Sequence, residues 1–272
     1  MSNVDFCITS FLRPEGLKNL IDSILKYYPD ANIIVALQGV SMDLDLLDYN
    51  ITVLTLPFDF GLSASRNYLA INSKAEYILL LEDDFVFTGD TKIERMVKVL
   101  DDLPGVGIVG GMVKENGQVL NFEHYLKIVD DTLIHVKDDD NYFDFLPDCN
   151  DEPFKVKKTG SVLNFCLIRN KVFDDILWDD ELKLIEHTDF YLRLAKTDWQ
   201  VYYTPDVAIN TVKINSVEYN KYRKRDIYHK KMMKKWGLKK IIHTNRHFRE
   251  LKDDKLIYGR VSDQAYNKLI NK

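Results

Sequence analysis

Short apolar runs alternate with helix-forming segments along the first 113 residues. The apolar runs, which predict buried strands, cover residues 4–12, 32–38, 50–56, 76–81 and 105–113. Between them, residues 14–28 carry apolar positions at helical spacing, and segments 61–73 and 91–102 are also predicted as helices. This alternation indicates an α/β protein with a doubly wound, mostly parallel sheet. Ligands of such sheets bind at the carboxyl ends of the strands.

The pattern changes after residue 113. Residues 118–137 predict a β-meander with a turn at Asp130 and Asp131, and 138–153 predict an acidic, irregular surface loop. A strand at 161–173, a helix at 186–199 and two short strands at 200–214, broken at Thr204-Pro205, follow. With no repeat or Gly/Ser linker, we expect one domain over 1–215 in two halves, about 1–113 and about 114–215. Residues 216–272 are expected to form a basic helical extension packed on it.

Composition adds few constraints. A hydrophobic content of 46% and a charged content of 29% are ordinary for a soluble globular protein. The N-terminus has neither a basic segment nor an apolar core typical of a signal peptide, and no apolar run reaches the roughly 18 residues of a membrane span. The three cysteines are scattered and lack zinc-site spacing. We therefore expect a reduced, cytoplasmic protein.

The net charge of −5 conceals an uneven distribution. Residues 213–272 hold 18 Lys and Arg against 6 Asp and Glu, and segment 221–240 alone holds ten against one. Such a segment predicts contact with an anionic surface, either a membrane, to which the protein would bind peripherally, or a phosphate-bearing or polyanionic acceptor. Nucleic acid is a weaker candidate. The alternative is internal, with the basic segment neutralising the acidic remainder of the chain.

Three adjacent acids, Glu82, Asp83 and Asp84, follow the strand predicted at 76–81. Adjacent carboxylates repel one another and resist desolvation, so their place at the end of a buried strand needs an explanation. A solvated strand end or a helix cap is one. A divalent cation is the other, because Mg²⁺ and Mn²⁺ bind one or two carboxylates together with substrate phosphates. We favour the cation.

Four stretches in order resemble the GT-A glycosyltransferases, above all the family 2-like group and the β-1,4-N-acetylgalactosaminyltransferases. They are FGLSASRNYLA (60–70), YILLLEDDFVF (77–87), the segment 177–209 that contains IEHTDF, and KKWGL (234–238). The resemblance implies a Rossmann-like GT-A fold, in which 1–215 would be the catalytic domain, with a nucleotide-binding half (about 1–113) and an acceptor half (about 114–215). It also implies a hexosyl- or N-acetylhexosaminyltransferase that uses Mn²⁺ or Mg²⁺. The enzyme would move a sugar from a nucleotide-diphosphate sugar to a carbohydrate or lipid-linked glycan acceptor, with inversion.

The resemblance also assigns the metal and nucleotide residues. Asp84 takes the place of the final Asp of the family's Asp-x-Asp motif, the direct metal ligand. Glu82 replaces the first Asp, and Asn210 stands where many members carry a metal-binding histidine. The remaining donor-site candidates are Thr9, Ser10, Arg13, Gln38, Asp59, Gly61, Arg66 and Asp83. Of these, Gln38 stands where the family usually has an acid.

The base of an inverting transferase must take a proton from the acceptor hydroxyl. Family members commonly carry Glu-Asp at the position of IEHTDF, with the Asp as base. Here Glu186 matches the Glu, His187 occupies the position of the base, and Asp189 matches a second family acid. His187 and Asp189 both remain candidates, because histidine can act as a base near neutral pH.

Two other functions are compatible with the sequence. A sugar-1-phosphate nucleotidyltransferase also uses a doubly wound sheet and Mg²⁺, but the segment TSFLRPEG is a poor match to a Gly-rich phosphate loop. A catalytically inactive binding module on the same fold is the other alternative, suggested by the departures at positions 82, 187 and 210.

Overall fold

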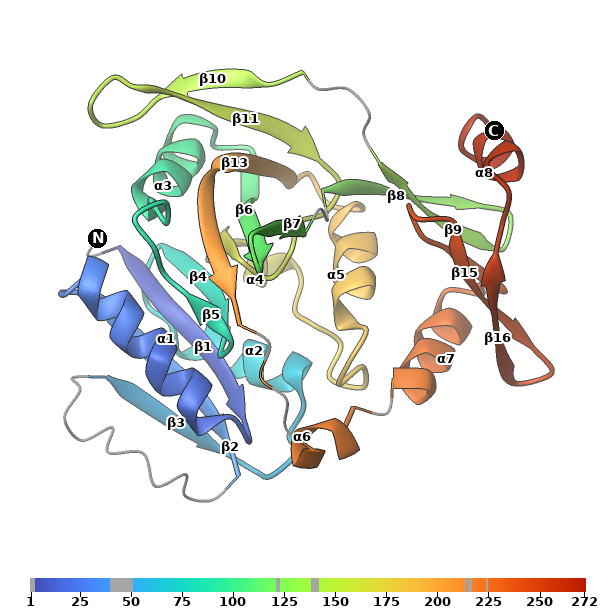
Figure 1. Cartoon of the computed structure of the whole chain (residues 1–272), viewed down its shortest axis with the longest axis horizontal. Coiled ribbons are helices and arrows are strands. Elements are labelled where there is room, and N and C mark those ends of the chain that lie inside the picture. Colours follow the sequence, from blue (N-terminus) through green and yellow to red (C-terminus); the bar gives the residue numbers. More distant parts are fainter. Residues whose placement is uncertain are drawn as a thin grey trace.

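The computed structural model describes residues 3–39, 51–120, 123–137, 142–212, 214, 217–223 and 225–272. Its centre is a mixed sheet in the order β10-β11-β13-β6-β12-β4-β1-β2-β3, with β5 paired to β13 and β7 paired to β6 (Figure 1). The first-half elements are β1 (Val4–Phe11), α1 (Pro14–Tyr27), β2 (Asn32–Gln38), β3 (Thr52–Leu56), α2 (Leu62–Asn72), β4 (Tyr77–Glu82), β5 (Phe85–Val86), α3 (Ile93–Asp102) and β6 (Val106–Glu115).

Helices cover both faces of this sheet, as the sequence predicts. Leu17, Leu20 and Ile21 of α1 and the apolar side of α3 pack with Phe6 and Ile8 of β1. Successive strand residues point to opposite faces. Cys7, between Phe6 and Ile8, accordingly packs with α2 on the other side. The doubly wound arrangement follows from strands that are apolar on both faces.

Parallel register aligns the carboxyl ends of the central strands. Thr9 of β1 lies beside Glu82 of β4, and Phe11 of β1 lies beside Gln38 of β2. The predicted donor residues of three separate segments therefore meet at one edge of the sheet.

The second half departs from the predictions in several places. Its elements are β7 (Gln118–Leu120), β8 (His124–Val129), β9 (Thr132–Lys137), β10 (Asp144–Pro147), β11 (Pro153–Thr159), β12 (Cys166–Arg169), α4 (Val172–Asp175), α5 (Glu186–Leu194) and β13 (Gln200–Thr211). The predicted loop at 138–153 contains β10, which pairs with β11, while residues 138–141 lie outside the described residues. The two short strands expected at 200–214 are one strand, whose register shifts between Thr204 and Ala208. The turn at Asp130 is confirmed, with φ 55°.

The C-terminal extension is not uniformly helical, which corrects the sequence prediction. It contains α6 (Val217–Lys221), α7 (Arg225–Lys235), β14 (Lys240–Ile242), β15 (His247–Lys252), β16 (Lys255–Arg260) and α8 (Asp263–Ile270). Its strands join β9 and β8 in a second sheet, in the order β16-β15-β14-β9-β8. The expected boundary at 215/216 lies outside the described residues. The described helices include none that combines the length and apolar character of a membrane span.

The second sheet includes the meander strands, because β14 pairs in parallel with β9. In this pairing Lys240 lies beside Thr132 and Ile242 beside Ile134. Leu133, Met232, Met233 and Ile241 form a shared core beneath it. The alternation of β15 and β16 is weak, since most of their side chains are exposed or half-buried. That weak pattern explains why segment 240–260 is not evident as strands in the sequence.

Candidate active site

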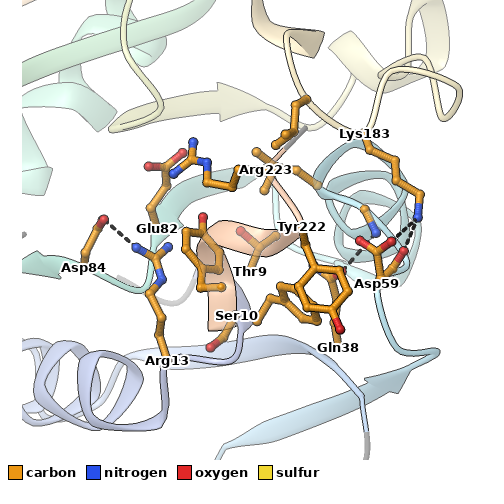
Figure 2. Close-up of a pocket in the computed structure, with 15 residues that line it drawn as sticks. Thr9, Ser10, Arg13, Gln38, Asp59, Glu82, Asp84, Lys183, Tyr222 and Arg223 are labelled. Atoms are coloured by element: carbon orange, nitrogen blue, oxygen red, sulfur yellow. Dashed lines mark hydrogen bonds and ion pairs between the residues drawn. The ribbon is translucent and has the colours of Figure 1, made fainter. Parts of the chain in front are cut away.

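A pocket opens at the carboxyl ends of β1, β2 and β4 (Figure 2). Its cavity volume of about 90 Å³ is small beside the roughly 300–1,000 Å³ of sites that enclose a drug-sized ligand, and the pocket is open to solvent. Its walls are formed by Thr9, Ser10, Phe11, Arg13, Gln38, Asp59, Gly61, Leu62, Glu82, Asp84, Lys183, Leu184, Tyr219, Tyr222 and Arg223. Eight of the donor and metal residues named from the sequence are in this set. The fold brings them together from strands β1, β2 and β4 and from loops near the ends of these strands.

Gly61 forms the narrow part of the pocket, directly before α2. Its φ of 101° favours glycine, and an added Cβ would lie 2.7 Å from the side chain of Lys183. Its amide donates to Oε1 of Gln38 at 2.9 Å, so Gln38 holds the turn. Lys183 binds the carboxylate of Asp59 at 2.9 Å. Lys183 is a pocket cation that the sequence analysis missed.

Arg13 binds two of the three adjacent acids. Its guanidinium forms ion pairs with Asp83 and, at 2.7 Å, with Asp84. Asp83 is fully buried and also accepts a hydrogen bond of 2.7 Å from Ser10 Oγ. Burial raises the pKa of Asp83 to about 7, against the opposing effect of Arg13. Asp83 therefore lies beneath the pocket, while Glu82 and Asp84 line it.

The structure allows a divalent cation at Asp84 and Glu82. Oδ1 of Asp84 is buried and has no hydrogen-bond partner among the described residues. Within the described ranges, no cluster of three or more His, Cys, Asp or Glu is arranged to hold a metal without further ligands. An unpartnered carboxylate oxygen at a pocket wall fits Mg²⁺ or Mn²⁺, which take a few carboxylates and complete their shell with substrate phosphates and water.

Asn210 does not line this pocket. It is exposed on β13, opposite Val86 of β5. The chain nevertheless passes close to the acids, because the amide of Val212 donates to the backbone carbonyl of Asp84 at 2.8 Å. The geometry gives Asn210 no contact with Asp84 or Glu82.

Arg66, a donor-site candidate from the sequence, is buried and is not among the residues that line the pocket. It is 1% exposed and pairs with Glu186 at 2.5 Å and with Glu82 at 3.2 Å. A buried guanidinium between two carboxylates compensates their charges. Arg66 thus joins α2, β4 and α5 and orients Glu82 toward the pocket.

Glu82 is linked to His187 through Asn164. Asn164 Nδ2 donates to Oε1 of Glu82 at 2.7 Å, and its Oδ1 lies 3.0 Å from Nδ1 of His187. Burial, followed by the neighbouring Arg66 charge, lowers the pKa of His187 to about 3. The imidazole is therefore neutral at pH 7, and in the ligand-free chain it is a weak base, because its surroundings disfavour the protonated form. Asn164 lies before β12 in a segment that carries no recognisable motif, so the sequence analysis missed it.

Asp189 has a different environment, although it is two residues from His187. It is fully buried, and its carboxylate accepts from Arg193 at 2.9 Å, from the Trp236 indole at 2.8 Å and from Lys235 at 2.7 Å. These contacts join α5 to α7. The structure therefore gives Asp189 a structural role in anchoring the C-terminal extension.

We expect Asp189→Asn to destabilise the protein by about 3 kcal/mol, the lower end for a broken buried ion pair, because Arg193 and Lys235 stay partly solvated. The measurement is the free energy of unfolding in urea. Asp179→Asn is the matched control, since Asp179 also pairs with Lys235 but is 23% exposed, and it should cost about 1 kcal/mol or less. Equal effects of the two substitutions would contradict the anchoring role.

Three histidines pack together in the second sheet, on β8, on β9 and directly after β14. Nδ1 of His135 lies 2.7 Å from Nε2 of His124, and the rings of His135 and His243 are 4.6 Å apart. Burial lowers the pKa of His135 well below its ordinary value and that of His243 to about 4, and the Arg249 cation beside His243 adds to the shift. Both imidazoles are neutral in the folded protein.

This arrangement predicts that stability falls as the pH drops below about 6.5. In that range the unfolded chain binds protons that the folded histidines do not, so stability changes by up to about 1.4 kcal/mol per pH unit for each group. His243→Asn should flatten the dependence of the melting temperature on pH between 6.5 and 4.5, and the exposed His247→Asn should not. Asp83, whose pKa is raised, instead stabilises the folded protein as the pH falls. This contribution is the same in the wild type and in both variants. Parallel curves for wild type and His243→Asn would count against the prediction.

Residues of the C-terminal extension complete the pocket. Tyr219, Tyr222 and Arg223 line it from α6 and the turn that follows. Tyr222 packs edge-on against Phe11 and Phe58. These residues lie more than a hundred positions from the donor segments and in no motif, so only the tertiary structure identifies them.

A polar pocket at the carboxyl ends of parallel strands is typical of nucleotide-binding α/β proteins. The family model for Glycosyl transferase family 2 matches residues 5–177. The chain belongs to this family.

Two curated relatives each match about 70% of this chain. Mouse beta-1,4 N-acetylgalactosaminyltransferase 2 is 31% identical over 190 residues, which cover 70% of this chain and 35% of that protein. Human beta-1,4 N-acetylgalactosaminyltransferase 1 is 28% identical over 196 residues, again 70% of this chain and 35% of the relative. The chain thus spans about a third of the length of these relatives.

Solved GT-A structures share the fold. TarS of S. aureus in complex with UDP-GlcNAc has a TM-score of 0.63 at 13% identity, covering 86% of this chain and 65% of that one. GalNAc-T7 with UDP, GalNAc and Mn²⁺ has a TM-score of 0.55 at 12% identity, with 78% and 44% covered. The predicted GT-A fold is confirmed.

Proposed function

We propose that the protein transfers a sugar from a nucleotide-diphosphate donor, a UDP-sugar, to a carbohydrate or lipid-linked glycan acceptor, with inversion. The observation that carries this proposal is the pocket at the ends of β1, β2 and β4, which gathers the donor residues expected of the family. The names of the relatives support an N-acetylhexosamine donor. The UDP-bound structures of the same fold support uridine.

The chain's own residues divide the work in this proposal. The pocket around Gln38, Asp59 and Gly61 holds the nucleoside, and Arg13 with Arg223 faces the diphosphate. Glu82 and Asp84 would hold a divalent cation, which when bound stabilises the negative charge of the leaving diphosphate. His187 is the proposed base. Glu186 is paired with Arg66, and Asp189 with three donors, so His187 is the neutral acceptor of the segment. For this role its pKa of about 3 in the ligand-free chain has to rise when the substrates bind.

Donor binding is tested by thermal shift with UDP-GalNAc, UDP-GlcNAc, UDP and CTP, each with and without Mn²⁺. A ligand at 100 times its Kd stabilises the folded protein by about 2.7 kcal/mol. A shift with uridine nucleotides that exceeds the shift with CTP is expected. Equal shifts would remove the assignment. Release of diphosphate from UTP and a sugar 1-phosphate would instead favour the nucleotidyltransferase, and donor binding without hydrolysis or transfer to any acceptor would favour the inactive module.

Contact of segment 221–240 with an anionic membrane is a separate hypothesis. The lysines of α7 form ion pairs within the chain: Lys230 and Lys234 with Asp254, Lys231 with Glu181, and Lys235 with Asp179. These pairs support the internal, neutralising role. We therefore expect no co-sedimentation with phosphatidylserine vesicles at about 0.15 M salt, where the Debye length is about 8 Å. Binding that is lost on reversing these lysines to Glu would restore the membrane hypothesis.

A further inference from the structure

The guanidinium of Arg13 lies where a cation bound to the acids would lie. It contacts both Asp83 and Asp84 (Figure 2 shows the pair with Asp84). Its side chain is only 9% exposed. The Asp84 oxygen that it leaves free, Oδ1, is also buried. A divalent ion at Asp84 is therefore repelled by the guanidinium of Arg13, and it finds one of the two carboxylate oxygens already paired.

The C-terminal extension holds Arg13 in this position. The ring centroid of Tyr219 lies 4.5 Å from the guanidinium carbon of Arg13, and the guanidinium carbon of Arg223 lies 5.2 Å from the same centroid. A cation over an aromatic face is attracted by the ring quadrupole. Arg13 thus has two sets of partners in the ligand-free chain, the acids and Tyr219, and of these Asp84 and Tyr219 line the pocket.

A donor diphosphate offers Arg13 a third partner. Guanidinium groups bind phosphate oxygens in the same forked geometry as carboxylates, and Arg13 lines the space that the diphosphate would enter. Movement of the guanidinium onto phosphate frees the Asp84 oxygens. The phosphates at the same time supply the oxygens that Mg²⁺ or Mn²⁺ requires beyond one or two carboxylates.

We propose that Arg13 is an exchangeable counter-cation that makes metal binding depend on the nucleotide diphosphate. In the ligand-free chain it occupies the carboxylates of Asp83 and Asp84, and on donor binding it transfers to the diphosphate and gives Asp84 to the metal. This inference rests on the proposed function. Coupling of this kind is reciprocal, so the metal raises the affinity for the diphosphate by the same factor as the diphosphate raises that for the metal.

The test measures Mn²⁺ binding directly, by electron paramagnetic resonance of the free ion and by calorimetry, without and with saturating UDP. In the wild type, UDP should tighten Mn²⁺ binding by roughly 5- to 150-fold, the usual range of coupling between two sites. UDP itself chelates Mn²⁺, so each titration is referenced to a protein-free mixture. Equal Mn²⁺ affinities with and without UDP would overturn the proposal.

Two variants test Arg13 without any nucleotide. Arg13→Gln combined with Asp83→Asn removes the cation together with its fully buried partner, and it leaves the 19% exposed Asp84 carboxylate without an ion pair for the metal to bind. This double variant should bind Mn²⁺ alone several-fold more tightly than the wild type, and Tyr219→Ala, which only loosens Arg13, should give a smaller gain. Arg223→Gln is the matched control, since it removes one positive charge from the same pocket at a residue that contacts Tyr219.

The outcomes separate this inference from the proposed function. If the double variant and Arg223→Gln change the Mn²⁺ affinity equally, the change comes from the loss of any positive charge in the pocket. The proposed exchange of Arg13 is then wrong. If Mn²⁺ binds neither the wild type with UDP nor the double variant, Arg13 is a permanent counter-ion and the exchange is again wrong. Failure of every uridine nucleotide to bind removes the proposed function, yet the double variant still reports on whether Arg13 competes with Mn²⁺.

Discussion

Asp84→Asn is expected to reduce the rate of sugar transfer by roughly 10²-fold or more, the loss typical of removing one group that stabilises transition-state charge. The neutral amide is a poorer ligand for a hard cation. It also removes the carboxylate oxygen that is buried without a partner beside the pocket. Mn²⁺-dependent donor binding, measured by thermal shift, should be lost together with the transfer activity.

The control for this variant is Asp90→Asn. Asp90 is a 72% exposed carboxylate that pairs with Lys114 at 3.5 Å and lies outside the pocket. It should change transfer by less than about twofold, as surface substitutions do. A folded Asp84→Asn protein with wild-type turnover and metal dependence would remove the assignment of Asp84 as a metal ligand.

His187→Ala should slow transfer by roughly 10²- to 10⁴-fold at saturating donor, the usual cost of losing a general base. Its neutral imidazole is connected through Asn164 to Glu82 at the pocket wall. The loss should appear in kcat, since the donor contacts lie elsewhere, and donor binding by thermal shift should be retained. The rate is measured with acceptor and donor both saturating.

Two comparisons accompany this variant. The exposed His247→Ala tests for non-specific effects of removing a histidine. Asp189→Asn, assayed at a temperature where it stays folded, should retain transfer within about tenfold, because its carboxylate is used in joining α5 to α7. If His187→Ala is as active as the wild type and Asp189→Asn is not, the base is Asp189. Its ion pair with Lys235 must then open during the reaction.

Much of the fold follows from local patterns. Strands that are apolar throughout, such as Tyr77–Leu81, require cover on both faces, and helices between them supply it. Parallel strands place their carboxyl ends together. That rule alone brings Thr9, Gln38 and Glu82 to one edge, as the register confirms.

Other elements could not be inferred in this way. Strand β14 has only three residues, and β15 and β16 have exposed or half-buried side chains with weak alternation. These strands form because β9 offers an edge to β14, which in turn pairs with β15. Pairing partners that are a hundred residues apart leave no periodic signal. The loop predicted at 138–153 likewise contains a strand, β10, because β11 is available beside it.

The sequence by itself determined the doubly wound sheet, the family and the place of the donor pocket, because these depend on periodicity and on short motifs. The tertiary structure decided how the charges are used. It buried Arg66 between Glu82 and Glu186, placed Arg13 on Asp83 and Asp84, committed Asp189 to α7, and brought Tyr219 to the pocket. The physical reason is that the role of a charged side chain depends on its partners and its burial, which are set by contacts between segments far apart in the chain.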